Sequence, residues 1–408
     1  MKSLQTLPLE IIGHIFDFSQ NLSFLQVSLK KNNLQNIFID TISIDDKNVK
    51  LFLSFFKNKK IKIKHLKING FLQQNNKNSK TIIIPILKRC DEKTLTSLNA
   101  SFADFISHQH VNIQCLQHMT NDELLCISKT TPQLTNIDLS YCFQITDKGL
   151  LHLSQHLFHL TSLNLYGCHK ITNDGLIHLS HLKNLTFLQL HTGCRLHGLY
   201  EQKLSEIGFD VLFCGLTKLT HLHLEFTSKD HKELQNIHKL TKLQDLDVFI
   251  KTKTNHFIDN EMKHISSLKQ LKKLNIFITS DIGHSREHMP KISDEGFQHL
   301  FSLKNLERFN LHDNGETMTN KKIQCVSSWK KLTFLSLCLN DSYILNSNTN
   351  IVHRDVNEIV SNQELMKLSS LTNLERLFLW GNKQITNDVL LNIIQNMNNL
   401  TYYQIFEY

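Results

Sequence analysis

One short run of residues recurs along most of this chain and constrains its fold more than any other feature. The run reads L-x-x-L-x-L, where x is any residue and another apolar residue replaces some of the leucines. Successive copies start 24 to 42 residues apart by subtraction of their first positions. Such a period predicts a solenoid, in which each unit needs its neighbours to bury a continuous core. The first leucines are Leu134, Leu160, Leu185, Leu219, Leu243, Leu271, Leu306, Leu332, Leu374 and Leu400.

Composition narrows the function classes. Hydrophobic residues make up 40% of the 408 residues and the mean hydropathy is −0.24, which allows a sizeable core. No uncharged apolar stretch reaches the length of about 18 residues that a membrane span needs, so we expect no membrane partner. Glu10 and His14 interrupt the apolar N-terminus, which argues against a signal peptide. Nine single cysteines without a C-x-x-C pair then indicate reduced thiols and a cytoplasmic or nuclear protein.

The net charge of +8 does not by itself indicate a nucleic-acid partner, because the lysines are spread along the chain. Only the segment from Lys57 to Lys67 is dense, and its alternation of Lys and Ile predicts a strand with one charged face. None of the 24 histidines is joined by Cys, Asp or Glu at the spacing of a metal site, so we expect neither a metal nor a cofactor.

One unit of the repeat predicts one coil of strand, turn and helix. Ile137 and Leu139 alternate with polar residues, which is the period of a half-buried strand. Thr146 is a natural helix N-cap, and Asp147 suits the first turn of the helix that follows. Leu150 and its neighbours then give that helix an apolar face. The next unit repeats the same order 26 residues later.

The ninth position of each unit carries a small hydrogen-bonding residue that faces inward. Recurrence at one position predicts a ladder that satisfies backbone groups inside the solenoid, and a structural role is favoured over catalysis or metal binding. The residues are Cys142, Cys168, Thr227, Thr279, Asn314, Asn340 and Asn382.

The pattern resembles leucine-rich repeats of the cysteine-containing subtype, L-x-x-L-x-L-x-x-C-x-x-I-T-D-x-G-L, which residues 134–150 and 160–176 match closely. The resemblance implies an α/β, right-handed horseshoe solenoid with strands inside and helices outside. We expect Leu163, Leu188, Leu222 and Leu246 to form a single buried row. Weaker units near Leu34, Ile63 and Leu95 suggest degenerate leading repeats over 41–133, before the solenoid proper at 134–408.

Residues 1–40 differ from the repeats. Pro8 suits a first helical turn, and an apolar stripe follows at helical spacing. The stretch resembles an F-box, whose motif L-P-x-E-[IL]-[IL]-x-x-I-[FL] matches Leu7 to Phe16, with a later match at Val27-Ser28. The aromatic residue that this family has after Val27 is absent. The resemblance implies that the ubiquitin-ligase adaptor would be bound by Leu7, Pro8, Glu10, Ile11, Ile12, Ile15, Phe16, Leu22, Leu25 and Val27.

An F-box followed by leucine-rich repeats implies a non-enzymatic substrate-recognition subunit of a cullin–RING ubiquitin ligase. The chain would act as a monomer within a complex that contains the adaptor, the cullin scaffold and an unknown protein substrate. The alternative is an interaction scaffold or inhibitor in which the N-terminus only caps the solenoid. A microbial or viral effector that imitates an F-box receptor, acting in the host cytosol, is a variant of the first interpretation.

In this repeat type the third, fifth, seventh and eighth positions of each unit face the concave surface. Aromatic residues recur at the seventh position, and exposed aromatic clusters with arginine are typical of binding sites. The hypothesis for the substrate surface is Tyr166, Phe249, Phe277, Arg308, Arg376, Phe378, Trp380 and Phe406. The competing interpretation is that these aromatics fill a cleft under a long loop. Loops over 281–291 and 340–353 would project from one rim.

Overall fold

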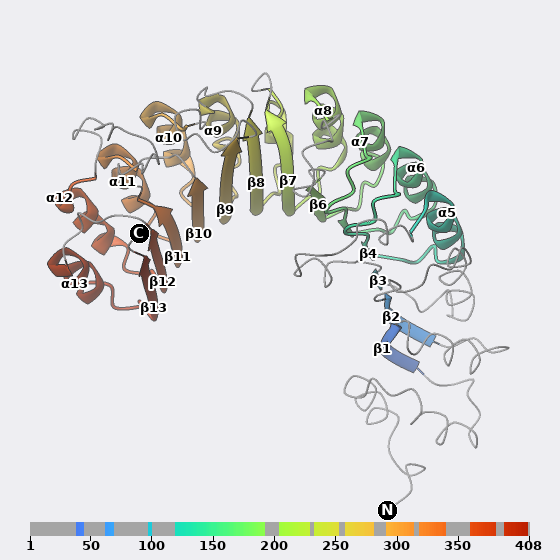
Figure 1. The fold of residues 1–408 in the computed structure, drawn as a ribbon, viewed down its shortest axis with the longest axis horizontal. Coiled ribbons are helices and arrows are strands. Elements are labelled where there is room, and N and C mark those ends of the chain that lie inside the picture. Colours follow the sequence, from blue (N-terminus) through green and yellow to red (C-terminus); the bar gives the residue numbers. More distant parts are fainter. Residues whose placement is uncertain are drawn as a thin grey trace, which may run out of the picture. The chain divides into compact units, whose positions relative to one another are not determined.

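In a computed structural model the chain divides into two compact units, Met1–Lys203 and Leu204–Tyr408, and each is considered by itself (Figure 1). The predicted F-box residues from Leu7 to Val27 lie outside the residues that the structure describes. Most of the predicted loop 281–291 and all of 340–353 lie outside them as well. The described ranges are 38–44, 62–68, 97–99, 119–191, 204–228, 232–252, 258–280, 291–313, 318–339, 360–380 and 387–406.

The first unit contains a parallel sheet whose strands are neighbours in the order of the sequence. β1 begins at Phe38, just inside the range predicted for the helical module, and the first three strands lie where the weaker units are predicted. The strands are β1 (Phe38–Ile44), β2 (Lys62–Ile68), β3 (Ser97–Asn99), β4 (Asn136–Asp138), β5 (Ser162–Asn164) and β6 (Phe187–His191). The described helices are α5 (Asn121–Thr130), α6 (Asp147–His156) and α7 (Asn173–Leu179).

The second unit repeats the same plan with longer strands. Its parallel strands are β7 (His221–Ser228), β8 (Asp245–Thr252), β9 (Lys273–Ser280), β10 (Arg308–Asp313), β11 (Phe334–Cys338), β12 (Arg376–Trp380) and β13 (Tyr402–Phe406). Its helices are α8 (Glu206–Gly215), η6 (Ile237–Lys239), α9 (Asp259–Ile265), α10 (Asp294–His299), η8 (Leu300–Ser302), α11 (Asn320–Ser327), α12 (Asn362–Leu365), η10 (Met366–Ser370) and α13 (Asn387–Gln395). Within the unit the helices lie along one face of the strands only (Figure 1). The predicted α/β leucine-rich-repeat solenoid is confirmed.

The core of each unit is built from rows of apolar side chains at matching positions. In the first unit Leu163 pairs with Leu188, and in the second Leu222 pairs with Leu246; all four are buried. The row in the second unit continues through Leu274, Phe309, Leu335 and Leu377. The first leucines of the repeats are buried as well, except Leu400, which is half-buried. Because burial of one such side chain contributes about 1.5–3 kcal/mol, these rows account for much of the stability of each unit.

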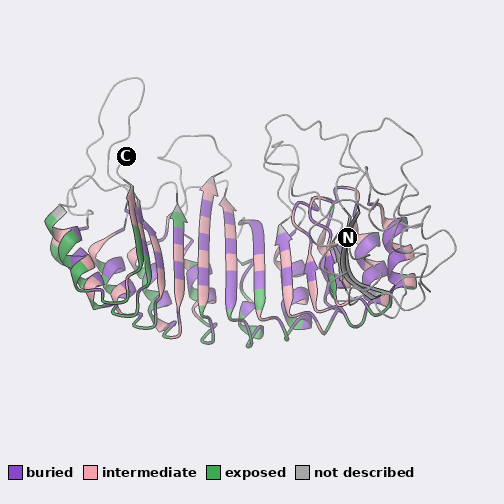
Figure 2. Cartoon of the chain, turned by 90° about the horizontal axis from the view of Figure 1, so that it is seen from below, coloured by how far each residue is buried: buried purple, intermediate pink, exposed green. Residues whose placement is uncertain are grey.

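The expectation that the eighth position faces the concave surface is wrong for the long strands of the second unit. Phe226, Ile250 and Ile278 occupy that position and are buried. β7, β8 and β9 each run for eight residues, so strict alternation continues and turns the eighth side chain toward the helices. Figure 2 shows this alternation as purple and pink bands along the strands.

Polar links between successive helices join neighbouring repeats along the helix side of each unit. In each link an Asn or Asp at the first residue of one helix bonds the Ser or Thr that caps the next. Thr146 is an N-cap as predicted, but its hydroxyl makes no bond within its own helix; it accepts from Asn121 Nδ2 at 2.8 Å. The links are Asn121 to Thr146, Asp147 to Thr172, Asp259 to Ser293, Asp294 to Thr319 and Asn320 to Ser361.

These links explain the glycine that follows Thr-Asp in the repeat motif. A Cβ added to Gly149 would lie 2.7 Å from Asn121 Oδ1, and one added to Gly296 would lie 2.8 Å from the Asp259 Cβ. Real Cβ atoms essentially never approach other atoms so closely. At Gly149 and Gly296 the linking side chain of the preceding repeat therefore leaves no room for a Cβ, whereas the repeats capped by Thr319 and Ser361 carry Lys322 and Glu364 at the same position.

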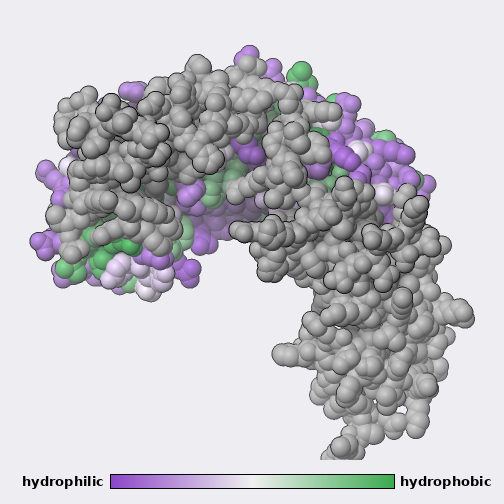
Figure 3. Space-filling view, in the orientation of Figure 1, coloured by the Kyte–Doolittle hydropathy of each residue, from purple (hydrophilic) through white to green (hydrophobic). Residues whose placement is uncertain are grey.

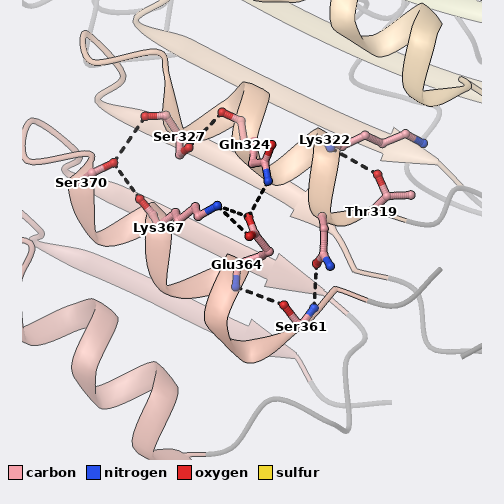
Figure 4. A network of polar contacts seen from close by, with 9 residues as sticks. Thr319, Lys322, Gln324, Ser327, Ser361, Glu364, Lys367 and Ser370 are labelled. Carbon is pink, nitrogen blue, oxygen red and sulfur yellow. Dashed lines mark hydrogen bonds and ion pairs between the residues drawn. The ribbon is translucent and has the colours of Figure 1, made fainter. Parts of the chain in front are cut away.

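The last repeats carry a denser layer of polar contacts between neighbouring helices, shown in Figure 4. Glu364 of α12 accepts hydrogen bonds from Lys367 Nζ at 2.6 Å and from Gln324 Nε2 at 3.1 Å. The hydrogen bond from Lys367, followed by that from Gln324, holds the pKa of Glu364 below its ordinary value. Ser370 completes the layer by donating to the carbonyl of Ser327 at 3.4 Å.

The predicted ladder of small residues is confirmed at Cys168, whose Sγ donates to the carbonyl of Leu139, 3.2 Å away in the preceding unit. Cys142 lies 4.0 Å from the carbonyl of Ser140. Burial raises the pKa of Cys168 to about 12, so this thiol is a structural hydrogen-bond donor. The prediction is wrong at Thr279, because alternation along β9 turns Ile278 toward the helices and its neighbour Thr279 to the opposite face. The predicted ladder positions Asn314, Asn340 and Asn382 lie outside the described residues.

Candidate protein-binding surface

The strands of the second unit present one face that no helix covers, which we call the strand face. It consists of the third, fifth and seventh positions of each repeat, and the strand register aligns them as three rows across β7 to β13. The third row is His221, Asp245, Lys273, Arg308, Phe334, Arg376 and Tyr402. The fifth row is His223, Asp247, Asn275, Asn310, Ser336, Phe378 and Gln404. The seventh row is Glu225, Phe249, Phe277, His312, Cys338, Trp380 and Phe406.

Over β7, β8 and β9 the strand face carries carboxylates that are matched by cations on adjacent strands. Lys273 Nζ lies 2.7 Å from Asp245 Oδ2. His223 Nδ1 lies 3.1 Å from Asp247 Oδ2. Lys251 forms an ion pair with the buried Glu225. Each of the three acidic side chains of this region therefore has a basic partner within the sheet.

Asp247 is the most constrained of these carboxylates. It accepts one hydrogen bond from the Asn275 amide in addition to its contact with His223. Burial raises the pKa of Asp247 above its ordinary value, while the neighbouring His223 and the Asn275 hydrogen bond oppose that shift. The arrangement is a satisfied polar cluster that fixes three neighbouring strands.

Two of the sequence-predicted residues stack on each other in the seventh row. The rings of Phe249 and Phe277 lie 4.2 Å apart and almost parallel, at 4°. His312 continues the row at 5.9 Å from Phe277. Both phenylalanines are half-buried, so one edge of the stack faces solvent. Partly exposed aromatic pairs of this kind are typical of protein-binding surfaces.

The third and fifth rows bring a second aromatic group together over β10 to β13. The Arg308 guanidinium lies 4.9 Å from the centre of the Phe334 ring. Phe378 lies 5.4 Å from Phe334 on one side and 5.4 Å from Tyr402 on the other. The exposed Arg376 is paired in register with Phe334 and Tyr402. In Figure 3 apolar and weakly polar surface is visible where the unit carries β12 and β13.

Two members of this second group, Phe334 and Tyr402, are missing from the residues chosen by sequence. Both occupy third positions, where only Arg308 and Arg376 attract attention in the sequence. Alignment of every third position would have identified them, because the leucine phase already fixes the register.

The remaining predicted residues are distributed differently. Trp380 is paired in register with Cys338 and Phe406 at the backbone, and the side chains of these three residues lie outside the described part of the structure. Tyr166 belongs to the first unit, where its ring packs edge-on against Tyr141 at 4.9 Å. The structure therefore groups Phe249 with Phe277, and Arg308 and Arg376 with Phe378.

Within the described ranges, no group of three or more His, Cys, Asp and Glu side chains is arranged to hold a metal ion. No helix in the same ranges is long and apolar enough to cross a membrane. What the strand face offers chemically is a long row of polar, aromatic and cationic groups on a rigid sheet, suited to contact another macromolecule.

A scan of protein-family models and a search of curated proteins both give no match for this chain. Among solved structures, it is similar to internalin C2 of Listeria monocytogenes, with 15% identity, coverage of 68% of this chain and 83% of that chain, and a TM-score of 0.35. A second internalin of Listeria monocytogenes, InlF, is 19% identical, with coverage of 70% and 89% and a TM-score of 0.34.

The complex of Rad7 and Elc1 from yeast gives 15% identity, coverage of 100% of this chain and 94% of that chain, and a TM-score of 0.43. Similarity at this level carries no argument about function. The parallel strands, the alternating helices and the buried leucine rows of the chain itself establish an α/β leucine-rich-repeat fold.

Proposed function

We propose that the chain is the substrate-recognition subunit of a cullin–RING ubiquitin ligase and holds a target protein on the strand face of its second unit. The observation that carries the binding half of this proposal is the aromatic and cationic character of that face, where Phe249 stacks on Phe277 and Arg308 on Phe334. A face meant only for water has no need of stacked, half-buried rings, whereas interface hot spots are rich in aromatic residues and arginine.

The adaptor half of the proposal rests on the sequence from Leu7 to Phe16, with Leu22, Leu25 and Val27. The motif supplies an apolar helical face of the kind that docks on an adaptor, and the repeats supply a separate surface for the target. Catalysis belongs to other subunits of the ligase. The chain therefore brings the target and the ligase together and performs no chemistry itself.

The adaptor is tested by a pull-down of the full chain from a eukaryotic lysate, compared with a Pro8→Ala/Ile12→Asp variant. We expect the adaptor and the cullin with the original chain and neither with the variant. Circular dichroism of both proteins checks that the repeats still fold. Absence of the adaptor from both samples would contradict the receptor function and favour an interaction scaffold whose N-terminus is a cap.

The target surface is tested with Phe277→Ala, because Phe277 contacts both Phe249 and His312. We expect proteins captured by the original chain to lose at least about tenfold in affinity, the loss typical of a hot-spot residue. The matched control is Phe301→Ala, which removes an exposed phenylalanine from η8 on the helix side of the same unit. Equal binding by the original chain and by Phe277→Ala would exclude this surface.

A further inference from the structure

The charges of the strand face are divided unequally between its two halves. Over β7 to β9 each of the carboxylates Asp245, Asp247 and Glu225 has a basic partner, lysine or histidine, on a neighbouring strand. Over β10 to β13 the third, fifth and seventh positions contain no acidic residue and two arginines, Arg308 and Arg376. No described carboxylate forms an ion pair with either arginine. The second half therefore presents positive charge that the sheet itself does not neutralise.

Two glutamates directly precede the arginines in the sequence, at the edge of this half. Glu307 and Glu375 occupy the second positions of their repeats, at the start of the strands. Lys272 Nζ lies 3.5 Å from Glu307 Oε1, so the Glu307 carboxylate is paired with a lysine and not with Arg308. Glu375 is exposed and directly precedes Arg376 in the sequence, so it lowers the net charge of the edge without covering the guanidinium.

The two arginines lie beside a continuous run of rings, Arg308 at its start and Arg376 between Phe334 and Tyr402 in the third row. Arg308 stacks on Phe334, Phe334 contacts Phe378, and Phe378 contacts Tyr402. We call Arg308, Phe334, Arg376, Phe378 and Tyr402 the aromatic–arginine patch. A planar guanidinium held against a ring is oriented for a two-pronged hydrogen bond to a carboxylate, and the exposed Tyr402 ring offers apolar area beside it.

We infer that the aromatic–arginine patch binds an acidic segment of the partner protein, one that carries an aromatic or aliphatic residue among its carboxylates. This inference rests on the proposed target-binding role of the strand face and names the class of segment that the face recognises. Carboxylates of the segment meet Arg308 and Arg376, and its apolar side chain packs against the exposed surface of the Phe378 and Tyr402 rings.

The geometry sets a spacing for that segment. Arg308 and Arg376 lie on β10 and β12, which are separated by one strand, so their backbones are about 10 Å apart at the ordinary distance between neighbouring strands. An extended chain advances about 3.3 Å per residue, so the two carboxylates are expected about three residues apart.

A nucleic acid fits the patch less well, although its bases also stack on aromatic rings. A phosphate backbone places a charge on every nucleotide, and proteins that follow it use an extended groove lined with cations. The patch contains two cations, and β8, two strands away from β10, carries the carboxylates Asp245 and Asp247 on the same face, where they would repel a continuing phosphate backbone. Charge complementarity therefore favours an acidic protein segment.

The test uses the full chain and three fluorescently labelled probes: a random copolymer of glutamate and tyrosine, polyglutamate, and a copolymer of lysine and tyrosine. Fluorescence anisotropy at physiological ionic strength measures binding. We expect the glutamate–tyrosine copolymer to bind more tightly than polyglutamate, and the lysine–tyrosine copolymer not to bind. Failure of the glutamate–tyrosine copolymer to bind would overturn the inference.

Two double variants separate the patch from general electrostatics. Arg308→Ala/Arg376→Ala is expected to weaken binding of the glutamate–tyrosine copolymer about tenfold or more. Lys239→Ala/Lys263→Ala removes the same charge from exposed positions on η6 and α9, and is expected to change it less than about twofold. Equal losses in both variants would overturn the inference, because they would mean that only the net charge matters.

A third variant and a competitor complete the experiment. Phe378→Ala keeps the charge of the chain. It is expected to weaken binding of the glutamate–tyrosine copolymer and to leave binding of polyglutamate nearly unchanged. The competitor is a single-stranded oligonucleotide. If it displaced the copolymer, and if its own binding disappeared in the Arg308→Ala/Arg376→Ala variant, the ligand of the patch would be a nucleic acid and the inference of a protein segment would be overturned. Because the probes need no adaptor, these outcomes are independent of the pull-down with Pro8→Ala/Ile12→Asp, and either result stands if the other fails.

Discussion

Substitution of Gly149 by alanine tests how neighbouring helices are joined. A Cβ at this position would lie 2.7 Å from Asn121 Oδ1, so the amide must move. The Asn121 amide makes two hydrogen bonds to Thr146, one to its N–H at 3.1 Å and one from Nδ2 to its Oγ at 2.8 Å. A displaced amide cannot keep both bonds. The substitution therefore acts through a residue of the preceding helix, α5.

The magnitude follows from these contacts. Net hydrogen bonds between neutral groups contribute about 0.5–1.5 kcal/mol each, so the loss of two amounts to about 1–3 kcal/mol. Alanine recovers up to about 1 kcal/mol through its higher helix propensity. We expect Gly149→Ala to lower the free energy of unfolding of this region by as much as about 2 kcal/mol, even though it replaces glycine within a helix.

In an Asn121→Ala background the same substitution should have a different effect. The obstructing amide is gone, and the remaining neighbours are side-chain carbons of Ile145 and Leu124 at 3.1 Å, which need to move only slightly. Gly149→Ala is then expected to be neutral or to stabilise the helix by up to about 1 kcal/mol. The coupling between the two sites is the difference, about 1–3 kcal/mol.

Native-state hydrogen exchange of the α6 amides gives the local free energy of opening for each of the four proteins in this cycle. Gly175→Ala in the Asn121→Ala background is the control, because Gly175 packs against Asp147 and should respond independently of Asn121. A coupling below about 0.5 kcal/mol between positions 121 and 149, the range expected for independent sites, would refute the role assigned to the link.

Two further predictions concern ionisable groups. Burial raises the pKa of Cys168 and of Cys325 to about 12. In the native chain at mildly alkaline pH, iodoacetamide should therefore modify the exposed Cys214 well before either of these thiols, and peptide mass spectrometry measures the order of labelling. Faster labelling of Cys168 than of Cys214 would contradict the burial of Cys168. The hydrogen bond from Lys367 lowers the pKa of Glu364, so this contact stabilises the fold above the ordinary carboxyl pKa and is lost as the pH falls through the lower folded value. Urea unfolding of Glu364→Gln should therefore show a deficit near neutral pH that shrinks in acid, and a deficit independent of pH would disprove this linkage.

The fold was predictable because the repeat fixes the phase of the chain. Leucine at the fourth and sixth positions forces alternate side chains inward, and Leu163, Leu188, Leu222 and Leu246 are all buried as this requires. Strand length was not predictable in the same way. β4 and β5 have three residues each, whereas β7 has eight. The alternation of buried and exposed side chains therefore continues along β7 as far as the buried Phe226.

Contacts that cross from one repeat to the next were harder to predict. Thr146 is an obvious helix cap in its own unit, but the partner of its hydroxyl, Asn121, lies 25 residues earlier. Likewise, the stack of Arg308 on Phe334 joins two repeats, and neither residue predicts it alone. Single-unit patterns describe a coil well, whereas the candidate binding surface is formed between coils.

The division of the strand face into a half with paired carboxylates and an open half leads to a prediction in which loss of a carboxylate strengthens binding. Lys273 now pairs with Asp245, and its next neighbour in the third row is Arg308. Asp245→Asn keeps the shape of the side chain and releases the Lys273 ammonium, which adds a third cation beside the aromatic–arginine patch. Affinity for the glutamate–tyrosine copolymer should rise by up to about fivefold, equivalent to about 1 kcal/mol for a partly exposed pair.

The control for this prediction is Glu295→Gln, which removes the same negative charge from an exposed position on α10, on the helix side of the unit. Anisotropy titrations of both variants separate the local release of Lys273 from the change in net charge. Because the ion pairs of β7 to β9 would have to be broken by any partner that bound there, the open half gains most from an acidic segment. An affinity that fell or stayed the same in Asp245→Asn would mean that these pairs do not set the charge that the partner meets.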